Sequence, residues 1–319
     1  MKILLLADTH LGFDFPIRPR IVRRRRGWDF FNNYQRILDT AISEQVDALI
    51  HGGDVFFRSK IPTEVVQRSY EPLLPVLERG INVFMVPGNH ERSRLPGSQI
   101  FRHPNFFLFD RPRTFKIERQ GLEVALAGFP NIRNGVSRAF SSTLHDTGIT
   151  EMESGFKILC LHQSIENSVV GAQNFRFRKG PDVIGLDQFT PDLDLIISGH
   201  IHRQQVLHNK YGKPIIIPGS IERTSFAERY EQKGFYLIEL GTDSVTWDFH
   251  KLPTRPMVEL ILEVELNDKK SMLDSLQRSI AELPLEAIVK VRCQSDRQLG
   301  LLKIGELREL FPDSCNVEL

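Results

Sequence analysis

Five short polar motifs carry the residue types that bind metal ions in proteins. Carboxylate, amide and imidazole groups together suit Mn, Fe, Zn or Co better than Ca or Mg. A carboxylate can bridge two cations, and two cations roughly 3.5–4 Å apart can activate water and clamp the attacking and leaving oxygens of a phosphate ester. The motifs therefore predict a dimetal phosphoesterase. They are Asp8-Thr9-His10, Gly53-Asp54, Gly88-Asn89-His90-Glu91, His162 and Gly199-His200-Ile201-His202.

Each motif taken alone is weak evidence, because a single histidine near a strand end is usually structural. Their common order and position give them weight, since every one of them follows an apolar run. The remaining histidines lie outside the motifs, and we expect them to be structural, with His51 packed in its strand. They are His51, His103, His145, His208 and His250.

The apolar runs are typical of strands that are buried on both faces. They are Ile3–Ala7, Ala48–His51, Ile81–Val86, Lys157–Leu161 and Leu193–Ile197. Functional residues collect beyond the carboxyl ends of such strands. Helices are predicted at Trp28–Glu44, at Thr63–Leu77 with a break at its two prolines, and at Val136–Leu144. Hairpins are predicted where 114–118 pairs with 123–127, 204–208 with 214–217, and 235–240 with 245–250.

Parallel strands with crossover helices, joined to hairpins, predict a layered α/β sandwich. Pro253 and Pro256 then interrupt the pattern, and a β-α-β-α-β unit without ligand-type residues follows. We predict a phosphoesterase domain over residues 1–252 and a small α+β capping and DNA-binding domain over 257–319. The predicted elements of the second domain are strand Val258–Leu266, helix Asp268–Leu283, strand Ala287–Cys293, helix Ile304–Phe311 and strand Cys315–Leu319.

The composition is ordinary for a soluble protein, with 25% charged residues and a net charge of +1. A neutral total does not exclude nucleic acid, because a local basic patch is sufficient. Three scattered cysteines argue against a disulfide framework and a zinc ribbon, and favour a reducing cytoplasm. The first apolar run is too short for a signal peptide, and no run is long enough to span a membrane.

The ordered motifs resemble the calcineurin-like metallophosphoesterase superfamily over roughly residues 1–250. The resemblance implies a four-layer α/β/β/α sandwich and two ions that share Asp54. One ion would be held by Asp8, His10, Asp54 and His202, and the other by Asp54, Asn89, His162 and His200. His90 would stabilise the transition state or protonate the leaving oxygen, a role that suits imidazole near neutral pH.

Two further segments, Gly199–Gln205 and Ile217–Glu228, resemble the SbcD-type DNA repair nucleases, as does the small C-terminal unit. This resemblance implies Mn-dependent hydrolysis of DNA phosphodiesters by a metal-activated hydroxide, an SMC-like ABC ATPase partner of the SbcC type, and a homodimer. The dimer surface would involve segments near Thr63–Leu77 and Leu95–Phe101. Single- and double-stranded DNA ends are the expected substrates, and whether cleavage is exo- or endonucleolytic stays open.

Arginine suits phosphate recognition, and a basic tract lies between the first strand and the first helix. We expect this tract and two arginines after His90 to contact the DNA backbone. They are Arg18, Arg20, Arg23, Arg24, Arg25, Arg26, Arg92 and Arg94. A second basic stretch, Phe175–Lys179, has interleaved aromatic residues that could stack on bases, but packing of a loop is the favoured interpretation.

One residue departs from the pattern of the repair nucleases. Phe57 stands where many of them carry a His or another polar residue, which puts processive exonuclease activity in doubt. Three alternatives stay open: a small-molecule or cyclic-nucleotide phosphodiesterase, a phosphoprotein phosphatase, and a DNA-end-binding scaffold without catalysis. Arg58 and Asn89-His90-Glu91 favour the phosphatase, but that branch would carry Asp at position 57.

Overall fold

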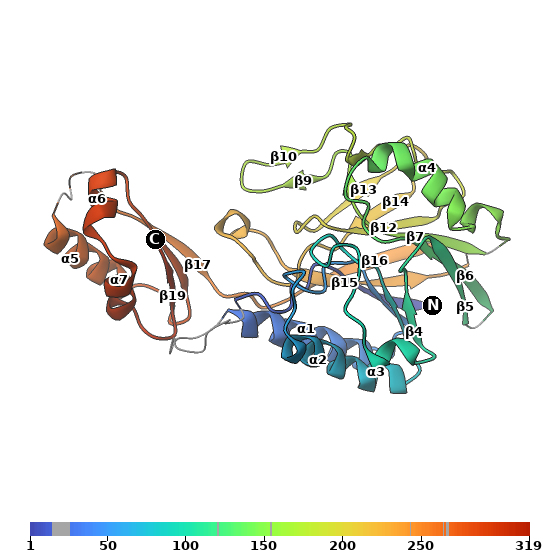
Figure 1. The fold of residues 1–319 in the computed structure, drawn as a ribbon, viewed down its shortest axis with the longest axis horizontal. Coiled ribbons are helices and arrows are strands. Elements are labelled where there is room, and N and C mark those ends of the chain that lie inside the picture. The colour runs from blue at the N-terminus through green and yellow to red at the C-terminus, as the bar shows by residue number, and fades with distance from the viewer. Residues whose placement is uncertain (15–25, 120, 154, 243, 264, 266–267) are drawn as a thin grey trace.

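The protein is described by a computed structural model that covers residues 1–14, 26–119, 121–153, 155–242, 244–263, 265 and 268–319. Two six-stranded sheets lie face to face (Figure 1). The first has the order β16-β15-β1-β2-β3-β4, and the second β13-β14-β12-β7-β6-β5. The strands of the first sheet are β1 Lys2–Leu6, β2 Ala48–His51, β3 Asn82–Met85, β4 Phe106–Leu108, β15 Gly234–Leu240 and β16 Val245–Lys251.

The second sheet has parallel strands at its centre and antiparallel strands at its edges. The three predicted hairpins are confirmed, since β5 pairs with β6, β13 with β14, and β15 with β16, all antiparallel. The strands of this sheet are β5 Arg113–Arg119, β6 Leu122–Gly128, β7 Phe156–His162, β12 Leu195–Gly199, β13 Gln205–His208 and β14 Pro214–Ile217.

Alternating side chains of β1 show how the layers are built. Ile3 and Leu5 face the second sheet and pack in the core between the two sheets. Leu4 and Leu6 point the other way and pack against α1 Gly27–Ser43 and the helices that follow it. On the outer face of the second sheet, α4 Val136–Asp146 covers a third core. The predicted four-layer α/β/β/α sandwich is therefore confirmed.

The helical segment at Thr63–Leu77 is broken, as its prolines predict. It consists of α2 Thr63–Tyr70, a 3₁₀ turn at Glu71–Leu73 and α3 Leu74–Glu78. Pro72 and Pro75 occupy early positions of the last two elements, where a missing N–H is tolerated. Further 3₁₀ turns are Gln99–Arg102, Ile149–Glu151 and Phe226–Glu228, and further short strands are β8 Ser164–Ile165, β9 Val169–Val170, β10 Phe175–Arg176 and β11 Val183–Ile184.

The C-terminal residues form a separate three-stranded sheet with its own hydrophobic core. The first predicted strand is shorter than expected, since it ends at Ile261 rather than at Leu266. A short helix after Ser295 was not predicted, because six residues are too few for a helical pattern; the Ser295 hydroxyl caps it by accepting a hydrogen bond from the Gln298 N–H. The elements are β17 Met257–Ile261, α5 Lys269–Ile280, β18 Ile288–Arg292, α6 Asp296–Leu301, α7 Ile304–Leu310 and β19 Asn316–Glu318.

A buried arginine joins this unit to the first helix. The guanidinium of Arg255 lies 3.3 Å from the Asp29 carboxylate of α1 and donates to the Asn316 side chain of β19 at 2.6 Å. The C-terminal sheet is thereby held beside the sandwich, although the division into two domains stays a prediction. All three cysteines are free thiols. Among the described residues, no helix has the length and apolar character needed to cross a membrane.

Candidate dimetal centre

The five motifs meet at one edge of the sandwich. Asp8 and His10 follow β1, Asp54 follows β2, and Asn89 follows β3, so the first sheet contributes four side chains. The second sheet contributes three more from the ends of β7 and β12. They are His162, His200 and His202. The carboxyl ends of the parallel strands in both sheets therefore face one space, as the positions of the motifs predict.

The ligand-type atoms of the carboxylates and imidazoles form three overlapping groups, and within each group they lie no more than 4.8 Å apart. One group contains Asp8, His10 and His202, and we call it the first end. Another contains Asp54, His162 and His200, and with Asn89 we call it the second end. The remaining group joins Asp54 to His10 and His90, so Asp54 lies between the two ends.

Both ends contain close contacts between ligand-type atoms. At the first end, the Nε2 atoms of His10 and His202 are 2.9 Å apart. At the second end, the Asn89 Oδ1 atom is 3.0 Å from His162 Nε2 and 2.9 Å from His200 Nδ1. The buried His10 Nδ1 has no hydrogen-bond partner among the described residues. This donor set, mixed in nitrogen and oxygen, fits two divalent transition-metal ions.

Three histidines are oriented by acceptors behind them. His162 Nδ1 lies 2.8 Å from the Gly52 carbonyl, and His90 Nδ1 lies 2.7 Å from the Phe57 carbonyl. His202 Nδ1 lies 3.1 Å from the Glu228 carboxylate. Because carbonyl and carboxylate oxygens only accept, each Nδ1 carries the proton, which leaves Nε2 directed into the site.

A buried lysine supports the acceptor behind His202. The Lys233 side chain has no exposed surface, and its ammonium group lies 2.7 Å from Glu228 and 2.9 Å from Glu231. It also donates to the carbonyl of His202 itself at 2.9 Å. Glu228 additionally accepts a hydrogen bond from the Thr224 hydroxyl. The first end is therefore held by a charged network from the segment 224–233.

The backbone at the site is strained. Asp8, Asp54 and His200 have φ values of 50°, 53° and 85°, in the left-handed region that costs non-glycine residues about 1–2 kcal/mol each. His10 is similar, with φ 42°. Backbone hydrogen bonds hold these turns, since the Asp8 N–H donates to the Gly53 carbonyl and the His10 N–H to the Asp54 carbonyl.

Two motif glycines are required by packing. A Cβ atom on Gly88 would lie 2.1 Å from Asp54 Oδ1, and one on Gly53 would lie 2.2 Å from His162 Nδ1. Gly53 also has φ +105°, which an L side chain rarely adopts. These two glycines therefore let the carboxylate and imidazole approach the backbone closely.

Burial and mutual charge dominate the electrostatics of the site. Burial raises the pKa of Asp8 to about 6, an effect that the neighbouring His162 and His202 partly offset. Burial also opposes ionisation of Asp54, but its histidine neighbours more than compensate and lower its pKa. His162 is likewise buried, yet Asp54 and Asp8 raise its pKa to about 9. A bound cation would favour the ionised carboxylates and compete with the protons on the imidazoles.

Phe57 lies against the site. Its ring centroid is 5.9 Å from that of His10 and 5.8 Å from that of His90, and Phe13 packs on it from the other side at 4.8 Å. The Phe57 carbonyl orients His90, whose Nε2 is 3.9 Å from Asp54 Oδ2. The side chain at position 57 is thus an apolar wall next to His90.

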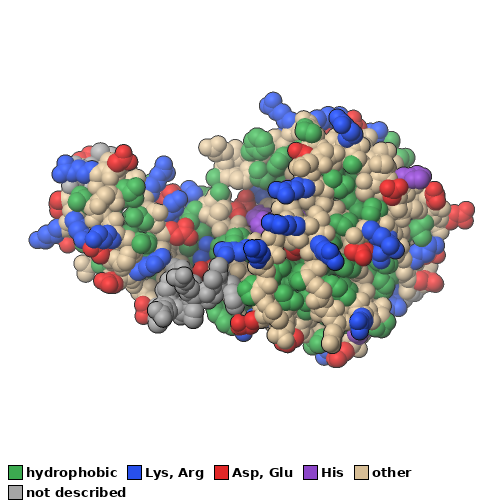
Figure 2. Space-filling view, viewed as in Figure 1, with side chains coloured by type: hydrophobic (Ala, Val, Ile, Leu, Met, Phe, Trp, Pro, Cys, Tyr) green, Lys and Arg blue, Asp and Glu red, His purple; other side chains and the backbone are tan. Residues whose placement is uncertain are grey.

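The predicted DNA-contact arginines have different environments. Arg18, Arg20, Arg23, Arg24 and Arg25 lie outside the described residues. Arg26 is only 5% exposed, and its guanidinium donates to the Arg223 carbonyl at 2.5 Å, so it contacts the protein interior. Arg92 and Arg94 are exposed. Figure 2 shows blue Lys and Arg side chains beside a hollow in which a histidine is visible.

The stretch Phe175–Lys179 is not a packed loop, which corrects the favoured interpretation. Its first residues form β10, which pairs with β9 in a hairpin that projects from the second sheet (Figure 1). Phe175 is 60% exposed and contacts the ring of Phe177 edge to face. A two-residue strand gives no periodic pattern, so the sequence alone could not separate a hairpin from a loop.

Sequence reasoning assigned no role to four residues that support the site. Glu91 accepts hydrogen bonds from the Phe56 and Gly88 N–H groups at 2.7 and 3.0 Å and ties two ligand loops together. Asn131, Glu228 and Lys233 act similarly on other loops. Glu91 adjoins the Asn89-His90 motif, which was a usable signal. Lys233 lies 31 residues from His202, and no local pattern reveals that contact.

The comparisons with known proteins agree with this geometry. The calcineurin-like phosphoesterase family matches residues 1–204. The chain is 27% identical over 281 residues to a protein of Saccharolobus solfataricus named DNA double-strand break repair protein Mre11, covering 86% of this chain and 69% of that one. A protein of the same name from Aeropyrum pernix is 23% identical over 328 residues, covering 95% and 75%.

A solved structure shares the fold. A dimetal phosphatase from Danio rerio superposes with a TM-score of 0.50 and 9% identity, covering 78% of this chain and 95% of that one. At this identity the similarity concerns the fold alone. The family match extends over more than half of the chain and contains all of the ligand-type residues, the last of which is His202. The chain therefore belongs to the calcineurin-like phosphoesterases.

Proposed function

We propose that this chain is a metal-dependent nuclease that hydrolyses DNA phosphodiesters in the repair of double-strand breaks. The observation that carries the proposal is the convergence of seven ligand-type side chains, with Asp54 at their centre and His90 directed at the same space. The names of the similar proteins supply the substrate, since both are called DNA double-strand break repair proteins. The coarser activity, a phosphoesterase, follows from the family.

Each ligand-type residue is proposed to hold one ion, except Asp54, which holds both. Asp8, His10, Asp54 and His202 would hold one ion, and Asp54, Asn89, His162 and His200 the other. Manganese is the proposed metal because of the resemblance to the SbcD-type nucleases, and the mixture of imidazole nitrogen and oxygen ligands fits it as it also fits Fe, Zn or Co. Two such cations, when bound, would activate water and offset the charge of the phosphate.

Residues around this centre are proposed to position the substrate and to protonate its leaving oxygen. His90 presents Nε2 to the site because its Nδ1–H donates to the Phe57 carbonyl. When both ring nitrogens carry a proton, His90 is placed to donate the Nε2 proton to the departing sugar oxygen. Phe57 cannot exchange a proton. Its ring, which contacts that of His10, would serve only to shape the space for the substrate backbone.

A homodimer and an SMC-like ABC ATPase partner of the SbcC type belong to the same proposal. Leu74 is 41% exposed and lies in the segment expected at the dimer surface, so it is the position chosen to test self-association. Sedimentation of the wild-type chain beside Leu74→Glu tests the dimer. A monomeric wild-type chain would remove this part of the proposal.

The decisive experiment is Mn-dependent cleavage of end-labelled linear DNA, single- and double-stranded. His90→Ala is expected to abolish cleavage and to keep both bound metals, whereas His145→Ala, on the exposed face of α4, should cleave like the wild type. If the wild type hydrolyses bis(p-nitrophenyl) phosphate but no DNA, the small-molecule phosphodiesterase replaces the nuclease. Unchanged DNA processing in His90→Ala would favour the scaffold.

A further inference from the structure

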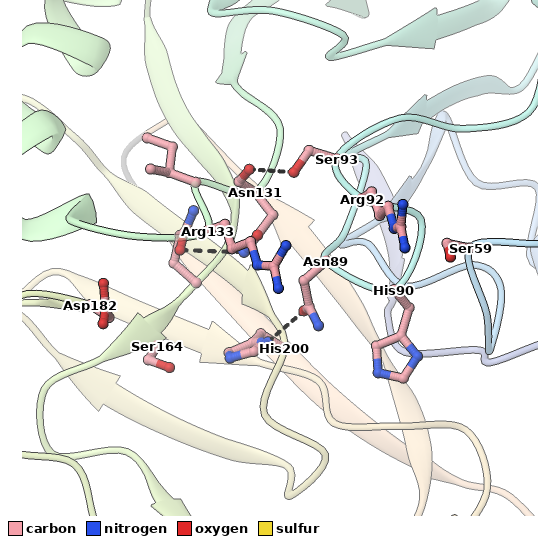
Figure 3. Close-up of a pocket in the computed structure, with 12 residues that line it drawn as sticks. Ser59, Asn89, His90, Arg92, Ser93, Asn131, Arg133, Ser164, Asp182 and His200 are labelled. Carbon is pink, nitrogen blue, oxygen red and sulfur yellow. Dashed lines mark hydrogen bonds between the residues drawn. The ribbon is translucent and has the colours of Figure 1, made fainter.

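A polar pocket opens directly from the second end of the candidate dimetal centre. Its volume is about 610 Å³, within the range of small-molecule sites. Asn89, His90 and His200 line it on the side of the metal centre, and its other lining residues include Arg92, Ser93 and the 131–133 loop. The pocket is therefore continuous with the space in which a phosphate would be hydrolysed (Figure 3).

Two arginines lie on opposite sides of Asn89 in this pocket. Figure 3 shows Arg133 beside Asn89 on one side and Arg92 above His90 on the other. Both side chains are exposed, and among the described residues neither guanidinium has an ion-pair or hydrogen-bond partner. The pocket's carboxylate, Asp182, instead accepts a hydrogen bond from the Gly135 N–H at 2.6 Å. The two guanidinium groups are thus free to bind an anion.

The walls that carry the two arginines are fixed to each other. Asn131 links three segments: its N–H donates to the Pro87 carbonyl, its side chain to the His162 carbonyl at 2.7 Å, and its carbonyl accepts from the Ser93 hydroxyl at 2.6 Å. Arg92 and Ser93 have φ values of 54° and 61°, two successive left-handed residues. Such strain persists where the surrounding structure holds it, often at binding sites.

We propose that this pocket is the subsite for the nucleotide next to the scissile phosphate, and that Arg133 and Arg92 bind a phosphate of that nucleotide. The inference rests on the proposed phosphodiesterase function and names the part of the substrate that the pocket takes. The polar lining suits a sugar and base edge rather than an apolar group. A substrate that carries a second phosphate would gain two charge-assisted contacts that a simple diester lacks.

The probe is thymidine 3′,5′-bisphosphate, and its dissociation constant is measured by calorimetry on the metal-free and the Mn-loaded protein. Arg133→Gln and Arg92→Gln are each expected to weaken binding about tenfold. Thymidine, which has no phosphate, should bind at least tenfold more weakly than the bisphosphate. Arg138→Gln is the matched control, because Arg138 is exposed on α4 and does not line the pocket.

A second readout compares two substrates. In Arg133→Gln, the ratio of kcat/KM for an oligonucleotide to kcat/KM for bis(p-nitrophenyl) phosphate should fall about tenfold. If both arginine variants bind the bisphosphate like the wild type, the subsite is wrong even where DNA is cleaved. If the wild type cleaves no DNA but bisphosphate binding depends on Arg133, the subsite stands and the nuclease proposal fails.

Discussion

The two ends of the candidate metal centre are supported by different physical means. At the first end, His202 is oriented by a carboxylate that a buried lysine neutralises, and both come from the segment 224–233. At the second end, His162 is oriented by a backbone carbonyl, and a motif glycine makes room for its ring. One end thus depends on paired buried charges, and the other on backbone geometry.

The two ends are therefore expected to be sensitive to different substitutions. A buried ion pair loses much stability when one partner is removed, because the other charge stays buried without compensation. A backbone carbonyl cannot be removed by substitution, so the orientation of His162 is lost only through changes that move the chain. Asp54 lies between the ends, so its loss would affect both of them.

The largest effect is expected for Asp54→Ala, which removes the group common to both ends. Activity should fall about 10³-fold or more, and the metal content should drop below two ions per chain. Metal analysis and phosphodiester hydrolysis measure the two effects. Asp146→Ala, at an exposed site on α4, is the control. Full activity with two bound ions in Asp54→Ala would contradict the assignment of the site.

Lys233→Met breaks the first end alone. The substitution leaves Glu228 and Glu231 buried without their cation, and we expect the free energy of unfolding to fall by about 3–5 kcal/mol. The affinity for one of the two metal ions should also fall about 10–100-fold, because Glu228 no longer holds His202 in place. Urea unfolding and metal titration provide the measurements.

The matched control for this variant is Lys251→Met at an exposed lysine of β16, which should be nearly neutral. An equal loss of affinity for both metal ions in Lys233→Met would show that the two ends are not independent. No loss of stability would mean that the Lys233 network does not support the fold.

Gly53→Ala tests the second end. The new Cβ would lie 2.2 Å from His162 Nδ1 at a backbone φ of +105°, so we expect a loss of about 2–4 kcal/mol from strain and displacement of the ring. Gly80→Ala separates the two causes, since Gly80 has φ +79° and open space around it. It should cost only about 1 kcal/mol. Thermal unfolding of both variants measures the difference, and equal losses would exclude the clash with His162.

Much of the fold, and the convergence of the candidate ligand residues, was predictable from the sequence. Buried parallel strands are apolar throughout, so β1, β2, β3, β7 and β12 were visible as short Ile-, Leu- and Val-rich runs. The ligand residues follow these runs directly, which is why Asp8, Asp54 and His162 could be placed at the carboxyl ends of their strands. Both the strands and the motifs could therefore be recognised from short stretches of sequence.

The supporting contacts were not predictable, because they join segments that are far apart in the chain. The pairing of β1 with β15 brings residue 2 opposite residue 239, and only then does the segment 224–233 reach His202. The burial of Arg26 likewise depends on its contact with Arg223. Backbone strain at Asp8 and His200 has only a weak signal in residue type, since Asp and His adopt a positive φ more often than most side chains but far less often than glycine.

The smallest expected effect is a pH dependence of stability caused by Glu222, which precedes the segment 224–233 that supports the first end. Burial raises the pKa of Glu222 to about 7 from its usual value of 4.5, even though the carboxylate accepts a hydrogen bond from the Arg223 N–H. Between pH 4.5 and 7 the folded protein therefore binds this proton more tightly than the unfolded chain does. The stability contributed by protonated Glu222 is present at low pH and is lost as pH rises through this window.

Glu222→Gln removes this titration, so the free energy of unfolding of the wild type should fall relative to the variant by on the order of 2 kcal/mol between pH 5 and 8. Urea unfolding of both proteins at each pH measures the difference. A parallel pH dependence of the two proteins would show that Glu222 is ionised in the fold. In that case Arg26 and Arg223, which lie close to the carboxylate, would neutralise it as Lys233 neutralises Glu228, and both ends of the segment would rest on buried charge pairs.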